Sequence, residues 1–175
     1  LMTGRYPWRF GATVNNGPWG FCGPRPNTEK FTLGKLFKRA GYGTGYVGKW
    51  HLGTTMATLD GKTQGLTNVD FKKPLTYGPG QFSFDYNFIL PGSLDMYPYA
   101  YARNHVWQGK ITAKKGWSAF NRVGPAEKDF QDHEVLETFY VEAESFIKKQ
   151  KKETPFFLFL ALTAPHTPTS PGAKW

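Results

Sequence analysis

The fold is decided by residues 42–53, which read Tyr42-Gly43-Thr44-Gly45-Tyr46-Val47 followed by Gly48-Lys49-Trp50-His51-Leu52-Gly53. The first six residues alternate and include Tyr, Thr and Val. This pattern predicts a short strand whose glycines let neighbouring backbone approach closely. The next six predict the loop that leaves the strand.

A helix is predicted just before this strand, with Thr32 as its N-cap and Gly41 as its stop. Apolar side chains at helical spacing predict one buried face, formed by Leu33, Leu36, Phe37 and Ala40. The chain therefore enters the strand from a helix, which is the order found in α/β units.

A second helix-then-strand unit lies near the other end of the sequence. A helix from His133 carries an apolar stripe of Leu136, Phe139, Tyr140, Ala143, Phe146 and Ile147. Residues 156–162 form a continuous apolar run, which is typical of a strand buried on both faces of a parallel sheet. Between the two units, residues 54–129 lack clear periodicity, and only short strands near 82–88 and 102–108 are expected there.

Composition excludes several classes of protein. Hydrophobic residues make up 39% and aromatic residues 17% of the chain, so it should fold. The net charge is +9, but the basic residues are scattered, and the run Lys148, Lys149, Lys151, Lys152 suits a solvated helix end, so no nucleic-acid partner is expected. No apolar run approaches the roughly 20 residues that span a bilayer. Cys22 is alone, so no internal disulfide forms.

Polar side chains follow both predicted strands, at the edge where open α/β sheets collect their ligand sites. An extended backbone would place Lys49 and His51 on one side of the chain and Trp50 on the other. Lysine supplies a fixed positive charge and histidine can transfer a proton near neutral pH, a pair that suits an oxyanion ester. His166 lies between Pro165 and Pro168 after the second strand. Taken alone, Lys49 and His51 would more often be surface residues, and His166 would more often cap the strand and bond a carbonyl.

The motifs taken together resemble the formylglycine-dependent sulfatases of the alkaline-phosphatase-like superfamily. Residues 1–7 are similar to the end of the first sulfatase signature, and residues 41–53 to the whole of the second. Later blocks follow in the family's order: Val69-Asp70-Phe71, Phe84-Asp85-Tyr86, Pro91-Gly92-Ser93-Leu94-Asp95, Pro155-Phe156-Phe157-Leu158 and Pro165-His166-Thr167-Pro168. The resemblance implies an α/β/α sandwich with a mostly parallel central sheet. It also implies that residues 1–175 are an incomplete N-terminal catalytic domain, missing both ends.

The resemblance assigns roles to individual residues. In the family, a hydrated formylglycine attacks sulfur while a calcium ion screens the charge. Lys49 would bind the formylglycine and a sulfate oxygen, and His51 would bond the formylglycine hydroxyl and act as base for sulfate release. His166 would contact the sulfate and protonate the leaving alcohol. Ser93 matches a polar substrate-binding position less closely.

The nucleophile and the metal ligands of the family fall outside the chain. The cysteine or serine that becomes formylglycine should precede Leu1, and Cys22-Gly23-Pro24-Arg25 departs from its motif because the arginine comes one place too early. Cys22 is therefore expected to be a packed thiol. The calcium ligands also lie elsewhere, and no residue here is predicted to bind metal.

The expected function is hydrolysis of sulfate esters, those of carbohydrates in particular, by a longer protein, with the fragment itself inactive. One alternative is a phosphonate or phosphodiester hydrolase of the same superfamily, and another is a non-catalytic anion-binding protein. The family further implies a formylglycine-generating enzyme as partner and export to the periplasm, the exterior or the lysosome. Aromatic side chains in residues 54–129 could stack on sugar rings or fill the core, and the core is favoured.

Overall fold

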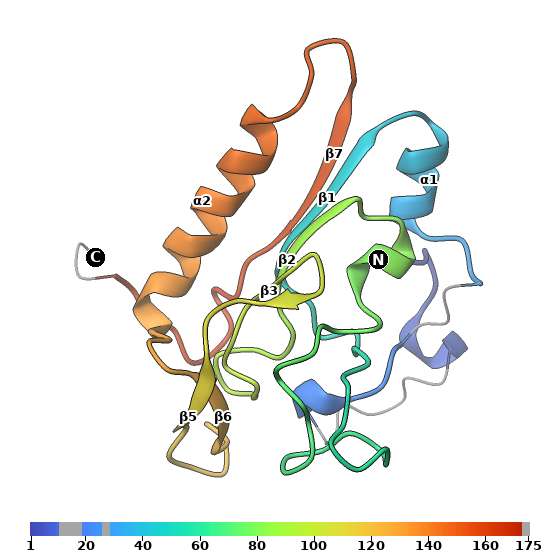
Figure 1. The fold of residues 1–175 in the computed structure, drawn as a ribbon. Coiled ribbons are helices and arrows are strands. Elements are labelled where there is room, and N and C mark those ends of the chain that lie inside the picture. Colours follow the sequence, from blue (N-terminus) through green and yellow to red (C-terminus); the bar gives the residue numbers. More distant parts are fainter. Residues whose placement is uncertain (11–18, 26–28, 173–175) are drawn as a thin grey trace.

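The computed structural model describes residues 1–10, 19–25 and 29–172, and its centre is a five-stranded sheet in the order β4-β3-β2-β1-β7 (Figure 1). Strands β1 (Gly43–Lys49), β2 (Tyr86–Leu90) and β7 (Phe156–Ala161) run parallel. The short strand β3 (Ala102–Arg103) is antiparallel to β2 and to β4 (Val106–Trp107). Both predicted helix-then-strand units therefore contribute to one sheet.

Two helices cover opposite faces of this sheet, as Figure 1 shows. Helix α1 spans Leu33–Arg39 and helix α2 spans Val135–Lys148. Neighbouring side chains of β1 point to different faces: Tyr46 belongs to the core cluster that Leu33 of α1 packs against, whereas Val47 belongs to the cluster that contains Phe139 of α2. This confirms the predicted α/β class, with a mostly parallel sheet between two helical layers.

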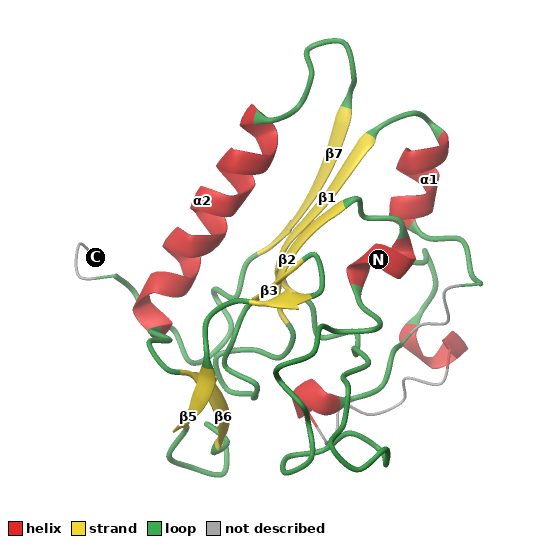
Figure 2. Cartoon of the chain, in the orientation of Figure 1, coloured by secondary structure: helices red, strands yellow, loops and turns green. Residues whose placement is uncertain are grey.

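A second, two-stranded antiparallel sheet extends beyond the carboxyl ends of the main strands. It consists of β5 (Ile111–Lys115) and β6 (Gly124–Glu127), which are not predicted from the sequence. Tyr99, in the segment that leads into β3, connects this hairpin to the main sheet. Its N–H donates to the Pro125 carbonyl and its carbonyl accepts from the Glu127 N–H, each at 2.9 Å. Loops and short 3-10 turns, the latter at Pro7–Phe10, Trp19–Phe21, Pro79–Phe82 and Asp132–Glu134, make up most of the remaining described chain (Figure 2).

The predicted helix ends agree with the structure better than the predicted buried faces do. The Thr32 side chain accepts a hydrogen bond from the Lys35 N–H at 3.3 Å, as an N-cap should. Four residues of the predicted apolar stripes are exposed instead: Leu36, Ala40, Tyr140 and Ile147. In α1 the close contact is made by Gly34, where a Cβ would meet the Phe82 carbonyl oxygen, so the helix turns its smallest residue to the core.

The strand predictions need four corrections. Strand β1 continues two residues past Val47 and so includes Lys49. The strand expected at 82–88 begins only at Tyr86, because Phe82 ends a 3-10 turn, and the one at 102–108 is the tight β3–β4 hairpin. Burial of β7 on both faces is wrong for this chain: Phe156 is 40% and Leu160 45% exposed, because within the described residues β7 pairs with β1 alone and forms the sheet edge.

Candidate functional site

Three of the predicted site residues, Lys49, His51 and His166, lie at the carboxyl ends of β1 and β7, which are parallel neighbours with Gly48 paired to Ala161. Lys49 is the last residue of β1 and is half-buried. Trp50 is buried behind it, with its indole N–H donating to the Gly53 carbonyl at 2.7 Å and its ring packed edge-on against Tyr46. The large apolar ring therefore anchors the loop that presents Lys49 and His51.

His51 leaves the strand direction, since its φ of 49° lies in the left-handed region. The prediction of an extended backbone through His51, with Lys49 and His51 on one side of the chain, is therefore wrong. Two main-chain hydrogen bonds hold the turn against the end of β2, from the Trp50 N–H to Leu90 at 3.0 Å and from the His51 N–H to Pro91 at 3.1 Å.

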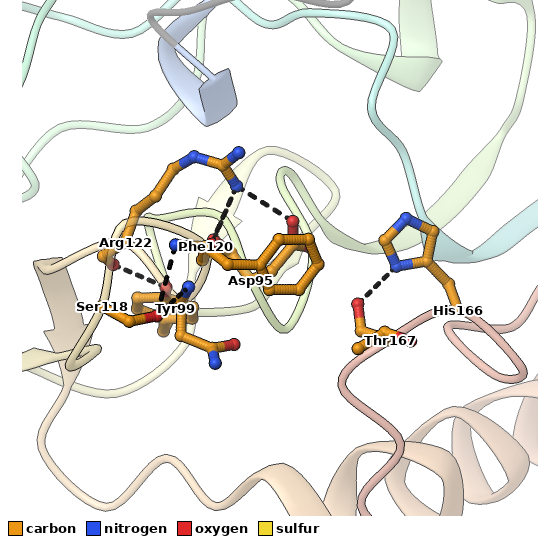
Figure 3. Close-up of polar contacts among 8 residues, drawn as sticks. Asp95, Tyr99, Ser118, Phe120, Arg122, His166 and Thr167 are labelled. Carbon is orange, nitrogen blue, oxygen red and sulfur yellow. Dashed lines mark hydrogen bonds and ion pairs between the residues drawn. The ribbon is translucent and has the colours of Figure 1, made fainter.

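His166 follows β7 and is exposed, with cis peptide bonds before both Pro165 and Pro168. Its Nδ1 lies 2.6 Å from the Thr167 carbonyl oxygen (Figure 3). A carbonyl oxygen can only accept, so Nδ1 carries the proton and Nε2 is the nitrogen that can exchange one with a ligand. A hydrogen bond to a carbonyl was the alternative to a functional role for His166. Here that bond determines which ring nitrogen carries the proton in the neutral ring.

Sequence reasoning missed two charged residues beside these three. The Asp95 Oδ2 lies 3.0 Å from the Arg122 Nη1, and the Asp95 side chain is 2% exposed. The second carboxylate oxygen of Asp95 is buried without a hydrogen-bond partner among the described residues. Asp95 stood in a recognised motif without an assigned role, whereas Arg122 stood in a stretch with no pattern at all.

We call Lys49, His51, Asp95, Arg122 and His166 the charged cluster, because each of the other four affects the proton affinity of His51. Burial lowers the pKa of His51 most, followed by the charge of Lys49, while the Asp95 carboxylate opposes the fall. Burial likewise lowers the pKa of Lys49, and Asp95 again opposes it. Two permanent cations face one carboxylate, so the cluster can attract an anion while His51 stays neutral and able to accept a proton.

Ser93 is 1% exposed in the turn between β2 and Asp95, where its main chain exchanges hydrogen bonds with Met96. Its predicted contact with substrate stays a prediction. Within residues 1–10, 19–25 and 29–172, no three side chains of His, Cys, Asp or Glu gather where they could hold a metal. Asp95, the carboxylate of the charged cluster, is already paired with Arg122. The described residues thus do not form a calcium site by themselves.

The family model for sulfatases matches residues 1–174. This chain belongs to the sulfatase family. Its similarity to curated sulfatases extends along the whole chain: it is 26% identical to an N-acetylgalactosamine-6-O-sulfatase of Bacteroides thetaiotaomicron over 219 residues and 29% identical to the N-acetylgalactosamine-6-sulfatase of Homo sapiens over 178 residues. The family resemblance inferred from the motifs is confirmed.

A solved structure concerned with glycosaminoglycan metabolism by Bacteroides thetaiotaomicron shares the fold, with a TM-score of 0.78, 25% identity and 99% of this chain covered. The chain spans only part of each of these sulfatases: 39% of the bacterial relative, 29% of the human one and 41% of the solved chain. No helix among the described residues is both long and apolar enough to cross a membrane.

Proposed function

We propose that this chain forms one wall of the active site of a longer sulfatase that hydrolyses sulfate esters of carbohydrates. The observation that carries the proposal is the meeting of Lys49, His51 and His166 at the ends of the parallel strands β1 and β7. The match of residues 1–174 to the sulfatase family supports the reaction class. Relatives named as N-acetylgalactosamine-6-sulfatases and an endo-4-O-sulfatase support a sulfated sugar as substrate.

Each side chain has a task that its surroundings suit. Lys49 binds a sulfuryl oxygen and stabilises the negative charge that grows there in the transition state. His51, kept neutral by burial and by Lys49, accepts a proton when sulfate leaves. In its doubly protonated form, His166 donates the Nε2 proton to the alcohol oxygen as the ester bond breaks, while its Nδ1–H stays hydrogen-bonded to the Thr167 carbonyl.

The nucleophile and calcium are proposed to come from the rest of the protein. A calcium ion, when bound there, would supply Lewis-acid stabilisation of the sulfuryl oxygens. The chain by itself is then inactive, since binding and proton-transfer groups cannot replace a nucleophile. Conversion of an upstream residue to formylglycine requires a formylglycine-generating enzyme as partner, and export from the cytosol is the location that we infer from family membership.

The test uses the full-length protein co-expressed with a formylglycine-generating enzyme, assayed with 4-nitrocatechol sulfate, an N-acetylgalactosamine 6-sulfate glycoside and a phosphate ester. We expect sulfate ester hydrolysis and a loss of about 10²- to 10³-fold in kcat for Lys49→Ala and His166→Ala. Lys62→Ala and His133→Ala, which alter exposed side chains outside the charged cluster, serve as matched controls.

Three results would refute the proposal. They are an absence of turnover, faster hydrolysis of the phosphate ester than of the sulfate ester, and variants of Lys49 and His166 that behave like their controls. The second result would support the phosphoester hydrolase that the superfamily also allows, and the first a non-catalytic anion-binding protein.

A further inference from the structure

The loop between β5 and β6 carries aromatic side chains on its surface. Trp117 is 66% and Phe120 is 45% exposed, in a chain that buries many of its other aromatic rings. Exposed aromatic side chains near a functional site commonly mark a contact surface for a ligand. The expectation that aromatic residues of this region fill the core does not hold for these two.

Hydrogen bonds within the loop give it a defined shape. The Ser118 hydroxyl oxygen accepts from the N–H groups of Phe120 and Asn121, at 3.2 and 2.8 Å. The Asn121 carbonyl in turn accepts from the N–H groups of Trp117 and Ser118, at 2.9 and 3.1 Å. The Phe120 ring is therefore carried by a closed turn, which reduces the conformational entropy lost when a ligand binds.

Arg122 fixes this turn to the charged cluster. Its N–H donates to the Asp95 carbonyl at 3.3 Å, its carbonyl accepts from the Tyr99 hydroxyl at 2.7 Å, and its Nη1 donates to the Phe120 carbonyl at 3.0 Å as well as to Asp95. Figure 3 shows Phe120 beside the Asp95–Arg122 pair, with its carbonyl hydrogen-bonded to Arg122. Arg122 belongs to the charged cluster, so its two contacts with Phe120 place this residue next to the cluster.

We propose that Phe120 is a substrate-binding residue that packs its ring against the apolar face of the sulfated sugar. A pyranose ring presents C–H groups on its faces and hydroxyl groups around its rim, so an aromatic ring can remove the C–H face from water without burying the hydroxyls. The Arg122 guanidinium carbon lies 5.8 Å from the ring centroid, and the remaining exposure of Phe120 leaves surface for the sugar. This inference rests on the proposed function and adds the residue that recognises the sugar.

The experiment compares Phe120→Ala with wild type in the full-length enzyme, using two ligands. An N-acetylgalactosamine 6-sulfate glycoside reports sugar and sulfate recognition together, and inorganic sulfate, used as a competitive inhibitor, reports anion binding alone. We expect KM for the glycoside to rise roughly tenfold and the inhibition constant of sulfate to change less than about twofold. Phe120→Tyr should restore KM, and Tyr140→Ala, which removes an exposed aromatic ring from α2, should leave both constants unchanged.

An unchanged KM in Phe120→Ala would overturn the inference. So would equal losses for glycoside and sulfate accompanied by a lower Tm, since that result would mean that Phe120 packs against another part of the full-length protein. If wild type hydrolyses no sulfate ester, the proposed function fails, and calorimetric Kd values for the same two ligands then decide the role of Phe120 by the same comparison.

Discussion

Asp95 and Arg122 form a nearly buried ion pair, with Oδ2 and Nη1 3.0 Å apart and 2% and 17% of the two side chains exposed. The pair connects the turn after β2 to the loop between β5 and β6. Replacing either residue would leave the charge of the other buried and uncompensated. Both residues are therefore needed to hold the two segments together. Asp95 also raises the pKa of Lys49 and of His51, which links the loop to the chemistry of the charged cluster.

Replacing Asp95 with asparagine should move the pH dependence of hydrolysis to lower pH. The amide oxygen of the new side chain can still accept a hydrogen bond from Arg122, but it lacks the charge that opposes the fall in the pKa of His51. If neutral His51 is needed, the acid limb of kcat/KM shifts down by a few tenths to about one pH unit. The measurement is a pH profile of the full-length Asp95→Asn enzyme, with the exposed Asp129→Asn as control. A shift to higher pH, or the same shift in the control, would show that Asp95 does not act on His51.

His51 itself should titrate below 6.5, because burial and Lys49 both lower its pKa. The unfolded chain then takes up the proton at higher pH than the folded one. The stability that neutral His51 contributes is therefore present above pH 6.5 and is lost as pH falls through the lower, folded pKa. An NMR titration of the ring protons, assigned with His51→Gln, gives the midpoint, and Lys49→Met should raise it. A midpoint at or above 6.5 in wild type would contradict the electrostatic account.

The sequence was sufficient for features that depend on local order. Thr32 is an N-cap because its side chain reaches the N–H three residues on, and β7 is a strand because its residues are apolar without interruption. Lys49 and His166 could be placed together because parallel strands end at one edge.

Features set by distant parts of the chain were not predictable in the same way. Asp95 and Arg122 meet only once the β5–β6 hairpin has folded back on Tyr99, and the apolar alternation of β5 is limited to Ile111 and Ala113. The exposure of β7 depends on which strands flank it, a property of the assembled sheet and not of its residues. His51 adopts a left-handed backbone that the motif alone does not reveal.

Thr32→Ala should lower the free energy of unfolding by about 1–2 kcal/mol, because the N-cap bond to Lys35 is lost. The buried Thr32 hydroxyl also donates to the Phe82 carbonyl at 3.3 Å, and that acceptor would lose its partner. Chemical denaturation of the full-length protein measures the change, with exposed Thr154→Ala as the matched control. Equal values for the two variants would show that the cap contributes little once α1 is packed.

Gly48→Ala should prevent β1 and β7 from pairing and thereby displace Lys49. Gly48 has a φ of 126°, and a Cβ there would collide with the Ala161 carbonyl oxygen. The variant thus suffers both backbone strain and a backbone clash. Gly41 has a φ of 82° with no atom within 4 Å of such a Cβ, so Gly41→Ala introduces strain alone.

Gly41→Ala should cost about 1 kcal/mol, whereas Gly48→Ala should cost several kcal/mol or abolish soluble expression. Where Gly48→Ala still folds, the inhibition constant of inorganic sulfate should rise, because Lys49 follows Gly48 directly. Unfolding free energies and sulfate inhibition of the two full-length variants separate strain from clash. If they lose equal stability, the close approach of β1 to β7 is not what fixes the position of Lys49.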